Sequence, residues 1–199
     1  MPRPRCERCT RPLDHCLCPL IPHLPSRTRV VLLQHPSETS HALNTARLAA
    51  LGLTNAELRV GEVFENLEAL LQTPGYRPVL LFPGEHAQAL CASPSADELP
   101  LLLIVPDGTW RKARKMLYLN PVLEALPKVT LANVPPSRYR LRKAPEPGAV
   151  STLEAVVHAL NVLEAPARFD ALLKPFEALI EGQISAMGCE TFERNHGDI

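Results

Sequence analysis

Continuous apolar runs, more than alternating ones, mark the predicted strands of this chain. Residues 29–33, 78–82 and 101–105 are dominated by apolar side chains, which is typical of strands buried on both faces. Residues 57–60 and 128–131 predict two shorter strands. Segments with helical character separate most of these runs, so the pattern predicts an α/β fold with a mainly parallel sheet.

Capping residues and prolines set the bounds of the predicted helices. Ser40 can cap a helix that runs to about Leu51 and is closed by Gly52. Ser151 and Glu154 are the ends of a capping box, which opens a helix that reaches about residue 163. The other predicted helices cover residues 64–71, 85–90, 110–119 and 169–187, and the last is interrupted at Pro175. Residues 133–149 are predicted to form a Pro-rich loop, and residues 188–199 a loose tail.

A lone carboxylate follows the 101–105 strand. Asp107 precedes Gly108, a turn residue, and Thr109, which can cap the next helix. Ligands in open α/β folds bind at the carboxyl ends of strands, so Asp107 lies at the expected reaction centre. The residues alone leave two interpretations open, a site residue or a structural cap, and capping by Thr109 would leave Asp107 free. The cations that follow suit an anionic polymer such as RNA; they are Arg111, Lys112, Arg114 and Lys115.

Length and hydropathy predict one globular core with a small appendage. The chain has 199 residues, of which 46% are hydrophobic, and no stretch reaches the roughly 18 apolar residues that a membrane span requires. Its first residues lack the apolar core of a secretory signal. We therefore expect a cytoplasmic protein without a membrane partner.

Charge is segregated although the net charge is zero. Residues 1–30 carry a net charge of +4, residues 111–143 carry +8, and the remainder carries −12. Local patches, and not the total, determine contacts with phosphates, so the two basic clusters predict an RNA-binding surface. In the second cluster, cations alternate along an extended segment around Tyr139, a candidate for stacking on a base. These cations are Arg138, Arg140, Arg142 and Lys143.

Four cysteines near the N-terminus predict a metal site. Cys6, Cys9, Cys16 and Cys18 lie within thirteen residues, and closely spaced thiols in a cytoplasmic chain favour tetrahedral zinc over disulfides. Redox-active or unliganded cysteines are the alternative. A zinc ion with four protein ligands cannot activate water, so we expect a structural role. The predicted domains are a zinc knuckle with a Pro-rich linker at 1–25 and an α/β catalytic domain at 26–199, and the lone Cys91 and Cys189 are predicted to be buried hydrophobes.

The order of several short motifs resembles the DTW-domain family, the tRNA-uridine aminocarboxypropyltransferases. The resemblance runs from about residue 6 to residue 160, and its specificity comes from the co-occurrence of the motifs. They are the four cysteines, Leu-Leu-Gln-His-Pro-Ser-Glu (32–38), Asn-Thr-Ala-Arg-Leu (44–48), Phe-Pro-Gly-Glu (82–85), Asp-Gly-Thr-Trp (107–110) and Ser-Thr-Leu-Glu-Ala (151–155).

The resemblance implies a fold, a reaction and a donor substrate. The fold would be related to the knotted SPOUT methyltransferases, with an S-adenosylmethionine pocket in loops at the ends of the sheet strands. The reaction would transfer the 3-amino-3-carboxypropyl group to N3 of a tRNA uridine and release methylthioadenosine. Because N3 carries an imide proton, a general base is expected, and Asp107 is the candidate. The apolar strand before Asp107 could raise its pKa.

With this resemblance in mind, we expect the donor pocket to include the turn after the 78–82 strand and the start of the Ser151 helix. Trp110 is predicted to lie in the core and not to stack on adenine. His35 and Glu38 follow a strand and are candidates for the pocket lining. For His35, a second interpretation is open, namely a turn histidine whose hydrogen bonds are satisfied locally. The predicted donor-binding residues are Phe82, Pro83, Gly84, Pro106, Gly108, Thr109, Gly148, Ser151 and Thr152.

Two other functions remain open from the sequence. A SPOUT-like RNA methyltransferase would use the same pocket and donor but transfer a methyl group. A zinc-knuckle protein that binds RNA without catalysis would have no use for the pocket. We also expect a monomer, because the zinc knuckle offers a second way to hold RNA.

Overall fold

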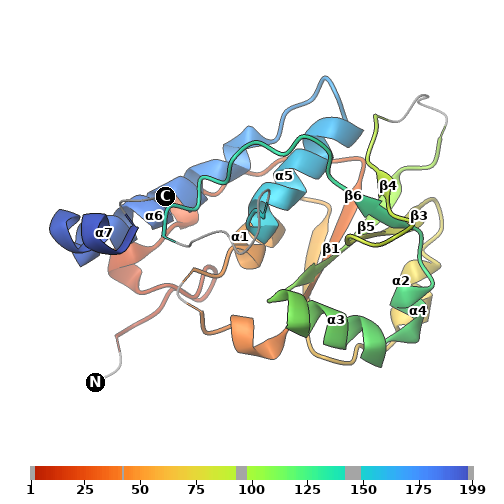
Figure 1. Ribbon diagram of the computed structural model, residues 1–199, viewed down its shortest axis with the longest axis horizontal. Helices are drawn as coiled ribbons and strands as arrows, with labels where there is room; N and C mark the ends of the chain where they lie inside the picture. Colours follow the sequence, from red (N-terminus) through yellow and green to blue (C-terminus); the bar gives the residue numbers. More distant parts are fainter. Residues whose placement is uncertain (1–2, 42, 93–97, 142–148, 197–199) are drawn as a thin grey trace.

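All strands of the sheet are parallel in the computed structural model, which describes residues 3–41, 43–92, 98–141 and 149–196 (Figure 1). In this part of the chain the sheet has six strands in the order β2-β1-β5-β3-β6-β4. The predicted α/β class with a parallel sheet is confirmed, and the knotted SPOUT-like arrangement stays a prediction. The strands are β1 (Arg29–Gln34), β2 (Ala56–Val60), β3 (Arg77–Leu81), β4 (Gln88–Ala89), β5 (Leu101–Asp107) and β6 (Lys128–Thr130).

Helices cover both faces of the sheet (Figure 1). α1, α5 and α6 pack on one face, and α2, α3 and α4 pack on the other. No described helix is long and apolar enough to cross a membrane. The helices are α1 (Ala46–Gly52), α2 (Leu67–Leu71), α3 (Trp110–Leu119), α4 (Pro121–Glu124), α5 (Thr152–Leu163), α6 (Leu173–Met187) and α7 (Cys189–His196).

The sheet has a hydrophobic core on each face. Each apolar strand contributes side chains to both cores, because successive side chains of a strand point to opposite faces. In β1, Val30 and Leu32 belong to the core under α5 and α6, whereas Val31 and Leu33 belong to the core under α2 and α3. The continuous apolar runs of the sequence therefore reflect burial on two sides.

The register of the central strands determines where the site lies. β5 lies between β1 and β3, and Gln34 at the end of β1 pairs in register with Asp107 at the end of β5. Because the strands are parallel, their carboxyl ends meet at one edge of the sheet, and both polar side chains lie there.

The N-terminal segment packs directly on the α/β core. Cys9, Leu17 and Ile21 are buried in the same apolar cluster as α5 and α6. Further along, the amide of Leu24 donates to the carbonyl of Gly52 at 2.9 Å. Residues 9–24 are thus held by tertiary contacts as well as by their own turns.

Two predicted segments have a different secondary structure. Residues 85–90 were expected to be helical, but Gln88 and Ala89 form β4, which pairs with β6. The prediction was wrong because pairing with a neighbouring strand outweighed a weak local helical preference. Residues 188–199 were expected to be a loose tail, yet α7 covers Cys189–His196.

Two helices and one additional short helix also differ from the prediction. α1 begins at Ala46 and not after Ser40, and the side chain of Asn44, instead of that of Ser40, accepts a hydrogen bond from the first turn, at the amide of Arg47. Pro175 does not interrupt α6, since it lies in the first turn, where a backbone N–H needs no helical partner. Pro121 ends α3 as predicted but also opens the short α4.

Candidate functional site

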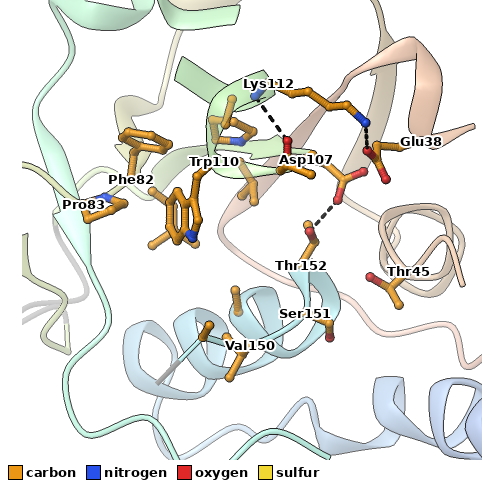
Figure 2. Close-up of a pocket in the computed structure, with 18 of the residues that line it drawn as sticks. Glu38, Thr45, Phe82, Pro83, Asp107, Trp110, Lys112, Val150, Ser151 and Thr152 are labelled. Atoms are coloured by element: carbon orange, nitrogen blue, oxygen red, sulfur yellow. Dashed lines mark hydrogen bonds and ion pairs between the residues drawn. The ribbon is translucent and has the colours of Figure 1, made fainter. Parts of the chain in front are cut away.

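A pocket of about 860 Å³ opens at the carboxyl edge of the sheet (Figure 2). It receives side chains from the ends of β3, β5 and β6, from the first turn of α3 and from the start of α5. This volume lies within the range of pockets that hold small-molecule ligands.

One wall of the pocket is aromatic. Phe82 and Trp110 meet edge to face, with ring centroids 5.6 Å apart, and Pro83 lies beside them (Figure 2). Trp110 is 40% exposed, so the prediction that it lies in the core was wrong. The helix cap at Thr109 starts α3 so that the indole borders the pocket, and this position depends on tertiary structure.

Asp107 is buried at the opposite wall, with 8% of its surface exposed. The hydroxyl of Thr152 donates to Oδ1, and Nε2 of Gln34 donates to Oδ2 at 2.7 Å. Burial raises the pKa of Asp107 above its ordinary value, and the negative charge of Glu38 adds to this effect, although both hydrogen bonds oppose it. The carboxylate is therefore fixed in position and more basic than an exposed aspartate.

An amide pair behind Asp107 was not predicted. Nε2 of Gln34 donates to Oδ1 of Asn44 at 3.0 Å, and Nδ2 of Asn44 donates back to Oε1 of Gln34 at 3.2 Å. Gln34 is fully buried, and a buried amide must be hydrogen-bonded. A polar residue at the end of an apolar strand was the available signal, but its partners depend on the register with β5.

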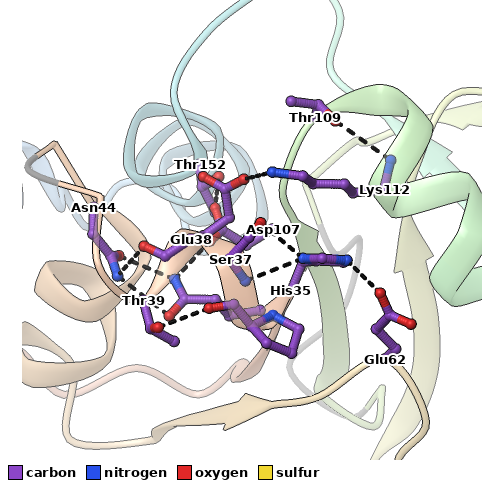
Figure 3. A network of polar contacts seen from close by, with 12 residues as sticks. His35, Ser37, Glu38, Thr39, Asn44, Glu62, Asp107, Thr109, Lys112 and Thr152 are labelled. Carbon is purple, nitrogen blue, oxygen red and sulfur yellow. Dashed lines mark hydrogen bonds and ion pairs between the residues drawn. The ribbon is translucent and has the colours of Figure 1, made fainter.

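Glu38 and Lys112 form an ion pair inside the pocket, with 2.7 Å between Oε1 and Nζ (Figure 3). His35 lies outside the pocket lining and instead contacts Glu62 at 2.7 Å and Ser37 at 2.9 Å. The sequence left the roles of these two residues undecided. In the structure Glu38 lines the pocket, and His35 is a turn histidine with satisfied hydrogen bonds.

Most of the predicted donor-binding residues lie together. The pocket is lined by Phe82, Pro83, Pro106, Gly108, Thr109, Ser151 and Thr152. Gly84 lies in the turn beyond Pro83 and is not part of the lining, and Gly148 lies outside the described residues.

Both predicted helix caps at the pocket are confirmed. Thr109 accepts a hydrogen bond from the amide of Lys112 at 3.4 Å, so Asp107 is free of the capping role. Ser151 and Glu154 form the capping box of α5. The buried Glu154 also accepts hydrogen bonds from Ser137 and from the amide of Arg138, which fixes the preceding loop to α5.

The cations of α3 divide into two groups. Lys112 faces the pocket and Lys115 pairs with Glu62 at 2.8 Å, whereas Arg111 and Arg114 are exposed and have no ion-pair partner among the described residues. Tyr118, which was not predicted, is 83% exposed two turns along the helix from Arg111.

The second basic segment lies along α6. Arg138 pairs with Glu177 and Arg140 with Glu181, so both arginines face the same helix. Tyr139 is buried edge-on against Phe176, which leaves little of its ring available to an RNA base. Arg142 and Lys143 lie outside the described residues.

The four N-terminal cysteines form a candidate metal centre. Their sulfur atoms all lie within 4.8 Å of one another, with 3.6 Å between Cys6 and Cys18 and 3.8 Å between Cys9 and Cys16. Tetrahedral zinc with Zn–S bonds of about 2.3 Å requires sulfurs about 3.8 Å apart, so this donor set fits zinc. Backbone amides of Cys9 and Arg8 lower the pKa of Cys6 to about 6, whereas burial raises the pKa of Cys18, so the four thiols differ in how readily they supply a thiolate ligand.

Cys91 does not belong to this cluster and is exposed. The prediction that it is a buried hydrophobe was wrong. Its place after the short β4, at the outer edge of the sheet, explains the exposure.

Comparison with known proteins gives consistent matches. A family model described as the DTW domain matches residues 3–184. The chain is 34% identical over 193 residues to tRNA-uridine aminocarboxypropyltransferase 2 of Drosophila melanogaster, covering 92% of this chain and 76% of the relative. It is 32% identical to the Macaca fascicularis protein of the same name, over 92% of this chain and 64% of the relative.

A plant relative is more distant. The chain is 28% identical to tRNA-uridine aminocarboxypropyltransferase A of Arabidopsis thaliana, over 80% of this chain and 72% of the relative. The chain thus spans about three quarters of the fly relative and just under two thirds of the macaque one. No solved structure matches the chain.

Proposed function

Because the chain belongs to the DTW domain family, we propose that it transfers the 3-amino-3-carboxypropyl group of S-adenosylmethionine to N3 of a uridine in tRNA. Methylthioadenosine is the second product. The observation that carries the proposal is a buried, hydrogen-bonded Asp107 on the wall of a pocket of about 860 Å³. This arrangement supplies a base and a donor site in one place.

The pocket fits the donor chemically. Its aromatic wall of Phe82 and Trp110 offers an apolar surface for the nucleoside, and the opposite wall carries charged groups for the amino-acid arm. S-adenosylmethionine supplies an electrophilic γ-carbon, from which a neutral thioether departs when the bond to N3 forms. Positioning that carbon, and keeping the smaller methyl group away from the uridine, is the task of the pocket walls.

Asp107 is the proposed general base. The N3 proton of uridine is a weak imide acid, and its transfer to the Asp107 carboxylate leaves a nucleophilic nitrogen. Burial brings the pKa of Asp107 closer to that of an effective base, while Gln34 and Thr152 keep the carboxylate in one orientation. A second role for Asp107 as a helix cap is unnecessary, since Thr109 caps α3.

The proposed tRNA surface begins at the pocket and follows α3. Arg111 and Arg114 are exposed and would contact phosphates, and the exposed ring of Tyr118 would stack on an unpaired base. Arg138 and Arg140 would extend the surface if they exchange their glutamate partners for phosphates. Phosphate contacts of this kind position the RNA, and its folded shape provides the specificity.

The cysteine cluster of residues 1–25 is proposed to hold structural zinc beside the catalytic domain of residues 26–199. Four thiolates would fill the coordination sphere, so the ion takes no part in the reaction. A tRNA substrate and cysteines without disulfides fit a cytoplasmic protein, and we also propose a monomer, because the zinc knuckle offers a second way to hold RNA.

The reaction products test the proposed function. Purified protein is incubated with S-adenosylmethionine and tRNA that lacks the modification, and nucleosides and small products are identified by mass spectrometry. Methylthioadenosine together with an aminocarboxypropylated uridine is the expected result. S-adenosylhomocysteine with a methylated nucleoside would establish a methyltransferase instead, and tRNA binding without either product would leave a non-catalytic RNA-binding protein.

A further inference from the structure

The Glu38–Lys112 ion pair lies inside the pocket and not on the outer surface. Its two side chains are 21% and 26% exposed, and both residues belong to the pocket lining. Glu38 comes from the 3₁₀ turn after β1, and Lys112 from the first turn of α3, so two separate elements bring the opposite charges together. Figure 3 shows the pair next to Asp107 and Thr152.

Lys112 is the one lysine or arginine among the described residues that line the pocket. The fixed negative charges of the lining come from Glu38 and Asp107. Lys112 is therefore the permanent cation that this described lining offers to an anionic group of a ligand, beside the imidazole of His41 and the amides at the start of α5. Lys115, three residues further along α3, pairs with Glu62 outside the lining.

The donor of the proposed reaction carries two opposite charges at one end. Its amino-acid arm ends in a carbon with both a carboxylate and an ammonium group, and that carbon is two bonds from the reacting γ-carbon. The charged groups must therefore lie within a few ångströms of the reaction centre. Asp107 marks this centre in the proposed function, and the negative charge of Glu38 is close enough to raise the pKa of Asp107.

We propose that Glu38 and Lys112 bind the amino-acid end of the donor, with Lys112 on its carboxylate and Glu38 on its ammonium group. This inference rests on the proposed function and specifies which residues select a donor with an intact amino-acid arm. It also gives Lys112 a different role from the phosphate contact that the sequence suggested.

The ion pair prepares the site without blocking it. Each side chain keeps about a quarter of its surface exposed, so water can solvate both charged groups while they separate. The zwitterion then provides each side chain with a new partner of opposite charge, and charge-assisted hydrogen bonds are the stronger class. Before the donor binds, the mutual attraction holds both side chains in the pocket.

Two ligands that differ only in the arm provide the test. S-adenosylhomocysteine carries the aminocarboxypropyl group on its sulfur, whereas methylthioadenosine has a methyl group there. Affinities of the full-length protein and of Lys112→Met and Glu38→Gln are measured by calorimetry. Matched controls are Lys128→Met and Glu124→Gln, which remove the same charges from a lysine–glutamate pair outside the lining.

We expect each pocket variant to weaken S-adenosylhomocysteine binding about tenfold or more, while methylthioadenosine binding changes less than about twofold. The controls should leave both affinities within about twofold of the starting protein. Equal losses for the two ligands, or no loss for either, would overturn the proposal while leaving the transferase function intact. If the unaltered protein binds neither ligand, the proposed function itself fails, which is a distinguishable result.

Discussion

At the scale of single residues, the environment of Asp107 is the most informative feature. Burial by the β5 strand raises its pKa, while Thr152 and Gln34 hold the charged form by hydrogen bonds. The sequence predicted the burial of Asp107, because a run of five apolar residues comes before it, with only Pro106 in between. It did not predict Gln34 as a partner, because that contact exists only in the paired sheet.

Replacement of Asp107 by Asn should separate catalysis from stability. Transfer should fall by about 10²–10⁴-fold because the base is lost. The free energy of unfolding at neutral pH should rise, because the asparagine amide is neutral and its burial does not desolvate a charge. The amide can still accept a hydrogen bond from Gln34 and donate one to Thr152.

The pH dependence follows from the raised pKa of Asp107. The wild-type protein loses stability as pH rises from 3.8, the ordinary pKa of aspartate, through the raised pKa of folded Asp107, because the folded state binds the proton more tightly. Below pH 3.8 Asp107 is protonated in both states, so the Asn variant should no longer be more stable than the wild type. Denaturant unfolding at several pH values measures this difference. Asp170, whose hydrogen bond with Arg168 lowers its pKa, is the control, and Asp170→Asn should destabilise the protein at neutral pH.

An Asp107→Asn variant with unchanged turnover would remove Asp107 from the mechanism.

Thr152 is a positioning residue, and its replacement should shift a pH profile. Thr152→Val removes the hydroxyl that stabilises the Asp107 carboxylate, so the pKa of Asp107 rises further. The acidic limb of the transfer rate should then move to higher pH, and Thr152→Ser should restore it. Rate measurements across pH check this, and a profile that keeps its midpoint while the rate drops would indicate a purely structural role.

At the scale of elements, α3 directs its cations to two different places, which the sequence could not separate. Its four cations were predicted to form one RNA-binding group, but the helix turns Lys112 into the pocket and leaves Arg111 and Arg114 outside. Residues three, four and seven apart share a helix face, which places Tyr118 in line with Arg111 and Arg114. The start of α3, set by the Thr109 cap, decides which cation faces which way.

The double variant Arg111→Gln/Arg114→Gln should weaken tRNA binding and make it less dependent on salt. Each lost phosphate contact lowers the slope of log affinity against log salt by about 0.7–0.9, so the double variant should lose about 1.5. Binding titrations at several salt concentrations provide the measurement. Arg77→Gln/Arg168→Gln, which removes two exposed arginines with acidic partners, is the matched control. Identical slopes in both double variants would place the tRNA elsewhere.

At the scale of the whole molecule, the cysteine cluster is connected to the candidate active site. Cys9, Leu17 and Ile21 are part of the core beneath α5 and α6. Arg11 donates to the backbone carbonyl of Asn44 at 3.2 Å, and Asn44 is paired with Gln34 behind Asp107. The cysteine segment and the pocket are therefore joined by a short chain of contacts.

Loss of the metal should destabilise the whole chain. The purified protein is expected to contain one zinc ion per chain by elemental mass spectrometry, and Cys9→Ser should lose it. The Tm should then fall by roughly 5 °C or more, the shift that about 2 kcal/mol produces in a chain of this size. Cys91→Ser is the control, because that cysteine is exposed and outside the cluster. A zinc-free wild-type protein with an unchanged Tm would contradict the structural role.

The sequence by itself determined the fold class, the helix caps at Thr109 and Ser151, and the types of side chain available for chemistry. These properties depend on neighbours a few residues away: apolar runs predict buried strands, Ser151 and Glu154 cap their own helix, and the spacing of the four cysteines predicts a cluster. They are therefore readable from a single chain.

Only the tertiary structure decided which of these groups meet. The Gln34 contact to Asp107 requires parallel register between β1 and β5, and the Glu38–Lys112 pair requires a turn and a helix start to converge on one pocket. The exposure of Trp110 and the burial of Tyr139 likewise depend on packing between distant segments. Local sequence carries no information on such long-range contacts, because the same residues could satisfy their hydrogen bonds and charges in many other arrangements.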